Sequence, residues 1–277
     1  MPVTPTNIAI ASIEAVLLLA GIWLLWRHVL GAKGRETFRQ PATVSPWTVT
    51  FSDFLTFAFL MIAGGLFAAF VGGFFIGRLQ LPQDTKTILN SATFQLGLLI
   101  GPALLPLNLG HHPLRPKLSF ADFRSGAVTF LITLPIVTLA NLAWLGVLEI
   151  CGLPVGQQDL LRLFSEATQP AVVVLMILLA TIVAPMAEEL LFRATLFRYL
   201  RTRIPRWMAL LLPGTLFAVL HVNWVTLDGL ASLVPLITLA VIFSVAYERT
   251  GKIATAMVAH GLFNLHTILL LVSGVTS

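Results

Sequence analysis

The segment Thr181–Arg206, TIVAPMAEELLFRATLFRYLRTRIPR, decides how the rest of the chain is interpreted. It begins as an apolar run suited to lipid, and it then places Glu188 beside Glu189, ahead of Arg193 and four further arginines. A carboxylate at membrane depth costs about 2.5–3.5 kcal/mol on insertion scales, so a pair of them inside a span usually marks function. The alternative is an ion pair near the membrane surface with an arginine anchor.

Helix geometry separates the two carboxylates. Glu189 and Arg193 are i,i+4 neighbours on one helix face, so they are predicted to form an ion pair. Glu188 is rotated by about 100° from Glu189, which leaves its carboxylate available for chemistry. Pro185 lies just upstream and lacks the N–H that a helix hydrogen bond needs, so it predicts a kink.

The composition of the whole chain is that of a membrane protein. Of 277 residues, 57% are hydrophobic and only 10% are charged, and the mean hydropathy is +0.91, which excludes an ordinary soluble domain. The basic residues behind the net charge of +5 lie between apolar runs, so we interpret them as topology signals and not as a nucleic-acid surface. The only cysteine, Cys151, excludes an internal disulfide and a multi-cysteine metal site.

Eight apolar runs approach the length of about 20 residues that a transmembrane helix needs. They are Ile8–Trp26, Phe54–Ile76, Ile88–Leu109, Val128–Leu148, Ala171–Phe192, Trp207–Val225, Leu230–Tyr247 and Ile253–Val272. The first run is interpreted as a span and not as a signal peptide, because it lacks a basic n-region and a small-residue cleavage site. We therefore expect an all-α, polytopic membrane bundle of about eight transmembrane helices.

The basic residues test this count. If the spans alternate in direction, fourteen of the seventeen lysines and arginines fall on one side, and only Arg78, Lys86 and Arg162 fall on the other. The positive-inside rule then places both termini outside the cell. It places the arginine cluster in the cytosol, and this cluster consists of Arg193, Arg198, Arg201, Arg203 and Arg206.

Two of the later runs also contain polar side chains at membrane depth. They are LFAVLHVNW (Leu216–Trp224), with His221 and Asn223, and AMVAHGLFNLHT (Ala256–Thr267), with His260, Asn264 and His266. A lone histidine in a membrane helix is often only a hydrogen-bond partner between packed helices. We interpret Asn223 and His266 in this way, as packing or supporting residues.

Depth distinguishes the remaining two histidines. Counted from the flanking basic residues, Glu188 lies about 7 Å and His260 about 12 Å inside the membrane. His221 lies about 15–20 Å from Arg206. Three ionisable side chains from three helices are therefore predicted to converge in the cytosolic half of the bilayer, which favours a catalytic cavity over simple packing.

Three motifs in this part of the chain resemble one family. EELLFR (Glu188–Arg193) matches EExxxR, FAVLH (Phe217–His221) matches FxxxH, and HGLFN (His260–Asn264) matches HxxxN. The segment YERTGKI, which starts at Tyr247, also precedes the last motif as it does in that family. In this order the motifs resemble the CPBP family, which comprises CAAX prenyl endopeptidases and bacteriocin-processing or self-immunity proteins. The resemblance covers about Ala171–Leu271.

This resemblance implies an intramembrane glutamic endopeptidase that acts in CAAX-box protein maturation and needs no cofactor. Glu188 would be the general base, His221 would help to hold the attacking water, and His260 and Asn264 would stabilise the oxyanion. Glu189, Arg193 and Phe217 would support them. Preorganised oxyanion donors can contribute about 3–4 kcal/mol each.

The resemblance also implies a place for the protein and a division of the chain. We expect a multi-pass protein of a prokaryotic plasma membrane, with its active site open to the cytosol and a peptide or prenylated protein as substrate. Within the single membrane domain, residues 1–127 would form helices without motifs, and residues 128–277 would form the catalytic core.

Two alternatives stay open. Glu188, His221 and His260 could bind Zn²⁺ as one carboxylate and two imidazoles, although the spacing is not HExxH and Asn264 suits an oxyanion donor better. The chain could instead be a transporter, a non-catalytic membrane scaffold or an immunity protein. Against a transporter, the two halves contain no matching pair of broken helices.

Overall fold

The computed structural model describes residues 5–103, 119–153, 164, 169–227 and 229–273, and within these ranges the chain is helical without a strand. In chain order its α-helices are α1 (Pro5–Leu25), α2 (Ala32–Arg39), α3 (Phe51–Ile76), α4 (Gln83–Ala103), α5 (Phe120–Ile150), α7 (Pro170–Leu178), α8 (Ala184–Glu189), α9 (Arg198–Arg201), α10 (Arg206–Val219), α11 (Leu233–Thr250) and α12 (Ile253–Val272). The π-helical segment η1 (Trp26–Leu30) extends α1, η2 (Leu179–Val183) and η3 (Leu190–Phe197) join α7, α8 and α9, and the 3-10 turn η4 (Leu230–Ser232) leads into α11. The expected all-α fold is confirmed.

Six of the described helices are long and apolar enough to cross a membrane, which confirms a polytopic membrane protein. They span Pro5–Leu30, Phe51–Ile76, Phe120–Ile150, Pro170–Arg201, Leu230–Thr250 and Ile253–Val272. The other two predicted spans correspond to α4 and α10, which do not meet the same criteria, so the count of eight is not confirmed. Residues 104–109 of the third predicted span lie outside the described residues.

The sixth span ends earlier than the hydrophobic pattern predicts. Helix α10 has 14 residues and is about 21 Å long, short of the ~30 Å of a bilayer core. The chain then turns, because Asn223 Oδ1 accepts hydrogen bonds from the backbone N–H groups of Val225 (3.1 Å) and Thr226 (3.4 Å). The sequence predicted that His221 lies inside a span, but it lies in the turn after α10. Val222, Trp224 and Val225 in the turn are apolar, so the hydrophobic pattern does not show where the helix ends.

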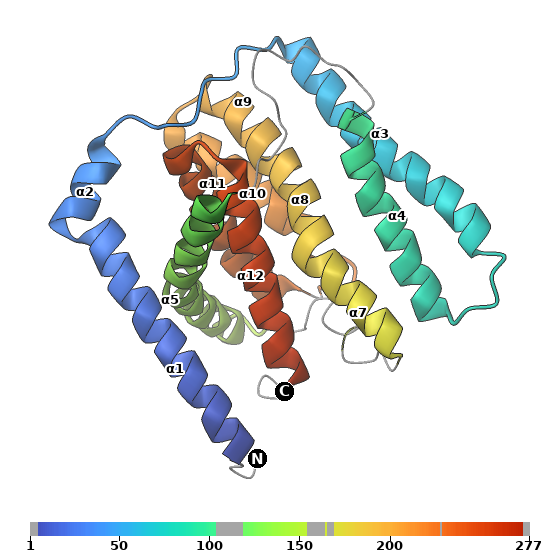
Figure 1. The fold of residues 1–277 in the computed structure, drawn as a ribbon, viewed down its shortest axis with the longest axis horizontal. Helices are drawn as coiled ribbons and strands as arrows, with labels where there is room; N and C mark the ends of the chain where they lie inside the picture. Colours follow the sequence, from blue (N-terminus) through green and yellow to red (C-terminus); the bar gives the residue numbers. More distant parts are fainter. Residues whose placement is uncertain (1–4, 104–118, 154–163, 165–168, 228, 274–277) are drawn as a thin grey trace.

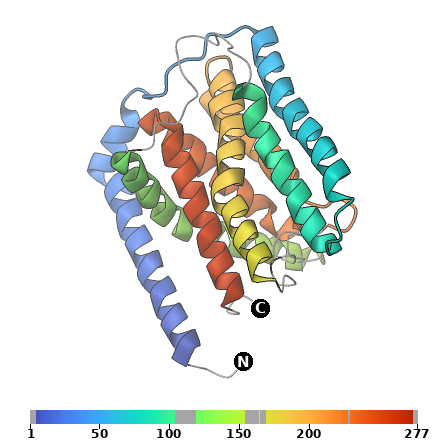
Figure 2. The same cartoon turned by 45° about the vertical axis from the view of Figure 1, so that its right-hand side comes forward.

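The helices form one bundle around α12 (Figures 1 and 2). Helices α5, α11 and α8 pack against α12, while α1 lies outside α5 on one flank and the α3–α4 hairpin lies beside α7 and α8 on the other. The start of α1 and the end of α12 lie at the same end of the bundle, as alternating spans require. Helices α2 and α9 lie at the opposite end, together with the last turn of α11.

The basic residues follow this polarity. The described members of the larger basic group flank the end that carries α2 and α9, whereas Arg78 and Lys86 flank the turn between α3 and α4 at the other end. The predicted segregation of charge is thus present in the described residues. Arg115, Lys117 and Arg162 lie outside them.

Pro185 shapes the central helix differently from a simple kink. Residues Pro170–Arg201 form one continuous helix of 32 residues that contains two π-helical segments. Pro185 has no N–H, so it cannot donate to the carbonyl of Thr181, four residues earlier as in an α-helix, or to that of Ala180, five residues earlier as in a π-helix. Helix α12 packs against both: Asn264 Nδ2 donates to the Ala180 oxygen at 2.8 Å, and Gly261 lies against the Thr181 oxygen.

A glycine packed against a carbonyl group upstream of a proline also joins α1 to α5. Pro135 lies inside α5, so the carbonyl of Leu131 lacks its usual backbone donor. Gly21 of α1 is buried against this oxygen, in a position where a Cβ atom would overlap it. Both close helix contacts therefore pair a proline-freed carbonyl with a glycine.

The arginine cluster does more than mark topology, because it holds the linker between α2 and α3. We call residues 40–50 the strap, and it runs across the end of the bundle (Figure 1). Arg198 Nε donates to the Ser45 carbonyl at 2.9 Å, and Arg203 donates to the carbonyls of Trp47 and Val49. The buried carboxylate of Glu248 accepts hydrogen bonds from Arg201 Nε at 2.6 Å and from Arg206 Nη2 at 2.7 Å. These contacts join the strap, α9, α10 and α11 at this end of the bundle.

Candidate active site

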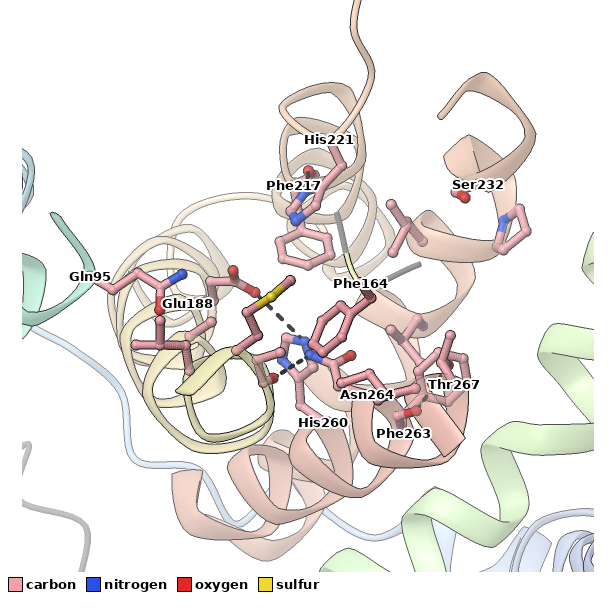
Figure 3. Close-up of a pocket in the computed structure, with 18 of the residues that line it drawn as sticks. Gln95, Phe164, Glu188, Phe217, His221, Ser232, His260, Phe263, Asn264 and Thr267 are labelled. Carbon is pink, nitrogen blue, oxygen red and sulfur yellow. Dashed lines mark hydrogen bonds and ion pairs between the residues drawn. The ribbon is translucent and has the colours of Figure 1, made fainter. Parts of the chain in front are cut away.

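A cavity of about 630 Å³ lies between α4, α5, α8, α10, α11 and α12 (Figure 3). Four residues that the sequence predicts to be catalytic line it: Glu188, His221, His260 and Asn264. They come from α8, from the turn after α10 and from α12, segments that are far apart in the chain. Helix packing thus brings the four side chains to one cavity.

Glu189 lies outside the cavity lining and is fully buried. Its Oε1 atom lies 3.0 Å from Arg193 Nη1, so the structure contains the predicted i,i+4 ion pair, although without the alignment of a hydrogen bond. The same oxygen lies 2.9 Å from His260 Nδ1. A carboxylate only accepts hydrogen bonds, so Nδ1 of His260 carries a hydrogen and the ring is held in one orientation. The sequence did not predict this second role of Glu189.

Glu188 faces the cavity, as its rotation from Glu189 predicts. Its side chain is 25% exposed, and its Oε2 atom lies 3.6 Å from His260 Nε2. His260 therefore stands between the two glutamates, with Nδ1 toward buried Glu189 and Nε2 toward Glu188 in the cavity. Figure 3 shows His260 and Glu188 on the same cavity. The distance to Glu188 is too long for a direct hydrogen bond and leaves the Glu188 carboxylate free.

Phe217 connects the parts of this site. The ring is buried and its centroid lies 5.0 Å from Arg193 Cζ, a cation–π contact that adds to the ion pair with Glu189. The ring also lies 4.4 Å from the ring of His221 and 6.1 Å from that of His260. The FxxxH spacing therefore places an aromatic ring against His221, and helix packing brings the same ring against the edge of His260.

His221 is oriented by its own helix. Its Nδ1 atom lies 2.7 Å from the carbonyl oxygen of Phe217, four residues earlier. A carbonyl can only accept, so Nδ1 carries the hydrogen, and Nε2 of the neutral ring keeps a lone pair. This nitrogen can accept a hydrogen bond from water.

The segment that forms this site matches a known family. Residues 170–266 match the family model described as type II CAAX prenyl endopeptidase Rce1-like. This part of the chain is Rce1-like. The resemblance to the CPBP family is confirmed over the helices that carry all three motifs, and at the level of the family it supports an intramembrane endopeptidase. A comparison with curated proteins and one with solved structures found no match.

Metal binding needs several ligating side chains grouped together. In the described ranges, no three His, Cys, Asp or Glu side chains form a group that could hold a metal ion. Glu188, His221 and His260, the alternative zinc ligands, therefore do not form such a group in this arrangement. Each histidine also has one ring nitrogen engaged, with Glu189 or with the Phe217 carbonyl.

Helix α4 completes the cavity, and the motifs gave no indication of it. Thr87, Ser91 and Gln95 line the cavity at i, i+4 and i+8, on one face of a helix outside the Rce1-like segment. Gln95 Oε1 is buried without a hydrogen-bond partner among the described residues. This polar stripe begins one residue before the third predicted span and continues into it, so the sequence could have identified the face of α4 that meets the cavity.

The two polar residues interpreted as packing have specific partners. Asn223 closes the turn after α10, as described above. His266 Nε2 lies 2.9 Å from Glu14 Oε1 on α1, so it joins the N-terminal helix to α12 and does not face the catalytic groups. His266 is also the last residue of the Rce1-like match, whereas α1 lies outside the match.

Proposed function

We propose that this protein is an intramembrane endopeptidase of the CAAX type in which Glu188 activates the attacking water. The observation that carries the proposal is the convergence of Glu188, His221, His260 and Asn264 on one cavity, within or beside helices of the Rce1-like match. A free carboxylate, an imidazole lone pair and two sets of N–H donors are the groups that peptide hydrolysis by water requires.

In this proposal Glu188 and His221 hold the nucleophile. Water donates one hydrogen bond to the Glu188 carboxylate and another to Nε2 of His221. When its oxygen attacks the peptide carbonyl carbon, Glu188 takes the proton. When the C–N bond breaks, Glu188 returns this proton to the leaving amine, so the protein ends the cycle unchanged.

His260 and Asn264 stabilise the oxyanion. Glu189 accepts from Nδ1 of His260, and in the charged form of the ring Nε2–H is left to donate to developing negative charge. Asn264 has two amide hydrogens and uses one on the Ala180 carbonyl, which leaves the second for the substrate. The bond to Ala180 fixes the amide, so this donor is preorganised.

The cavity is suited to a peptide that carries an apolar tail. Its volume of about 630 Å³ lies in the usual range for small-molecule sites, and Ile88, Val137 and Leu239 supply apolar walls beside the catalytic groups. We therefore propose a peptide or prenylated protein substrate. We also propose that the protein lies in a prokaryotic plasma membrane. The charge pattern favours an opening of the cavity toward the cytosol.

The test uses the purified full chain in detergent. A farnesylated peptide with a C-terminal CAAX sequence and the same peptide without farnesyl are incubated with each variant, and new termini are identified by mass spectrometry. Glu188→Gln keeps the size of the side chain and removes the base, so cleavage should fall to background. The matched control is Glu149→Gln, an exposed carboxylate at the end of α5, which should cleave like the unmodified protein.

Three results would count against the proposal. Normal cleavage by well-folded Glu188→Gln would exclude the glutamate mechanism. Loss of cleavage in excess chelator, restored by Zn²⁺, would favour the metal alternative. If the unmodified protein cleaves neither peptide, comparison of membrane proteomes containing the active protein or Glu188→Gln should still reveal new termini, and their absence would favour a non-catalytic scaffold.

A further inference from the structure

A second cavity, of about 560 Å³, lies at the end of the bundle that carries α2 and the strap. It is formed by η1, α2, α5 and α11, and it shares no lining residue with the catalytic cavity. Three of its four walls lie outside the Rce1-like match, which covers only α11. Its chemistry therefore belongs to features that the proposed catalytic function does not use.

The cavity is lined by cations and by no acidic residue. Arg27, His28, Arg124 and Arg249 belong to its lining, whereas Glu36 on α2 is exposed and does not. Arg27 and Arg124 are exposed, and neither forms an ion pair within the part of the chain that the structure describes. Two unneutralised guanidinium groups therefore stand at the rim of one cavity.

Arg249 is held in place between the elements that form the cavity. Its Nη atoms donate to the carbonyl oxygens of Thr37 (3.2 Å), Phe38 (2.6 Å) and Gln40 (2.8 Å). These hydrogen bonds cap the C-terminal end of α2. Its Nε atom is buried and has no hydrogen-bond partner among the described residues. A fixed positive charge with an unpaired donor thus accompanies the two exposed arginines.

The rest of the lining is apolar, and the surroundings are those of a membrane interface. Val128, Ile132 and Ile242 continue the cavity along α5 and α11. Trp26, Phe120 and Phe123 are exposed on η1 and on the first turn of α5. Exposed aromatic rings beside arginines are typical of the headgroup level of a bilayer.

We propose that this cavity binds one anionic phospholipid, with its phosphate at Arg27, Arg124 and Arg249 and the start of an acyl chain along the apolar wall. Basic pockets between transmembrane helices bind anionic headgroups in this way. A free phosphate would use the cations but not Val128 and Ile132. An acidic peptide segment would match the charge, but it would not match an apolar wall that faces the membrane.

The test measures retention of phosphatidylglycerol by the delipidated full chain in neutral detergent, using native mass spectrometry. Phosphatidylcholine with the same acyl chains and inorganic phosphate alone serve as the other probes. The double variant Arg27→Gln/Arg124→Gln should bind phosphatidylglycerol roughly thirtyfold more weakly, at about fivefold for each arginine near the headgroup. The matched control Lys33→Gln/Arg39→Gln removes two exposed charges from the same end and should bind normally.

A variant that keeps the charge provides an independent test. Ser125→Phe fills the cavity from α5 without altering any arginine, so it should also reduce retention. The proposal is overturned if both double variants lose lipid equally, if Ser125→Phe retains lipid fully, or if phosphatidylcholine binds as well as phosphatidylglycerol. Displacement of the lipid by millimolar phosphate would assign a free-anion site, and co-purification of an acidic peptide in place of lipid would assign a protein partner. Either result would refute a lipid site.

Discussion

Replacing Gly261 with alanine should disable the active site without changing a catalytic side chain. Gly261 lies on α12 against the Thr181 carbonyl oxygen that Pro185 leaves without a donor, and an added Cβ atom would lie well inside 3.0 Å of this oxygen. The oxygen belongs to the backbone of a long helix and cannot rotate away as a side-chain atom could. To reach ordinary contact, which begins at 3.4 Å, the two helices must separate by about 1 Å.

This separation acts directly on the site. His260 precedes Gly261 and Asn264 follows it by three residues, so both would move away from α8 and η2. Their hydrogen bonds, 2.9 Å to Glu189 and 2.8 Å to Ala180, would lengthen beyond hydrogen-bond range. A misplacement of about 1 Å can cost about 10²-fold in rate, and overpacking a core costs about 1–3 kcal/mol of stability. We expect a hundredfold lower turnover in a protein that still folds.

The assay is cleavage of the peptide substrate together with thermal unfolding in detergent. Gly146→Ala is the matched control, because Gly146 lies in helix α5 and an added Cβ atom would meet nothing within 4 Å. This control should keep full turnover, with equal or slightly higher stability, since alanine favours a helix by up to about 1 kcal/mol. If Gly261→Ala cleaves at the unmodified rate, the close contact of α12 with η2 does not position the site, and the reasoning is refuted.

The remaining predictions concern the supporting pair, the amide donor and the topology. Glu189→Gln and Arg193→Gln should each destabilise the protein by about 3–5 kcal/mol because each leaves a buried partner uncompensated, and the double variant should lose less than the sum in chemical unfolding; additive losses would argue against direct pairing. Asn264→Ala should lower turnover by about 10²–10³-fold, as expected for one oxyanion donor, and unchanged single-turnover rates would exclude that role. A reporter fused after Ser277 should be non-cytosolic and one inserted near Arg201 cytosolic, and finding both on one side would contradict the inferred topology.

Much of the fold could be predicted from the sequence because insertion into a membrane imposes simple rules on helix length and on the placement of charge. Apolar runs of about 20 residues indicate helices, and the side on which lysines and arginines collect indicates how the helices alternate. Within one helix, the spacing of Glu189 and Arg193 is enough to predict their ion pair, because residues four apart share a face. The same rule separates Glu188 from Glu189. These predictions need no information about neighbouring helices.

Other features depend on contacts that hydrophobicity does not encode. The run Trp207–Val225 is mostly apolar, yet α10 stops at Val219 and Asn223 closes the turn that follows. The arginine cluster resembles a topology signal, yet its side chains bind the carbonyl groups of a strap far away in the sequence. The polar stripe Thr87, Ser91 and Gln95 was present in the sequence, but only the position of α4 shows that it meets the catalytic cavity.

The sequence by itself determined the membrane class, the polarity of the helices and the residue types of the site, since all of these follow from composition and from spacing along single helices. Only the tertiary structure decided that His260 stands between Glu188 and Glu189, and that Asn264 bonds the Ala180 carbonyl. The physical reason is that distances between helices are set by packing. Here that packing depends on a proline that gives the helix no backbone hydrogen bond and on a glycine that lets α12 approach the carbonyl of Thr181, four residues before it.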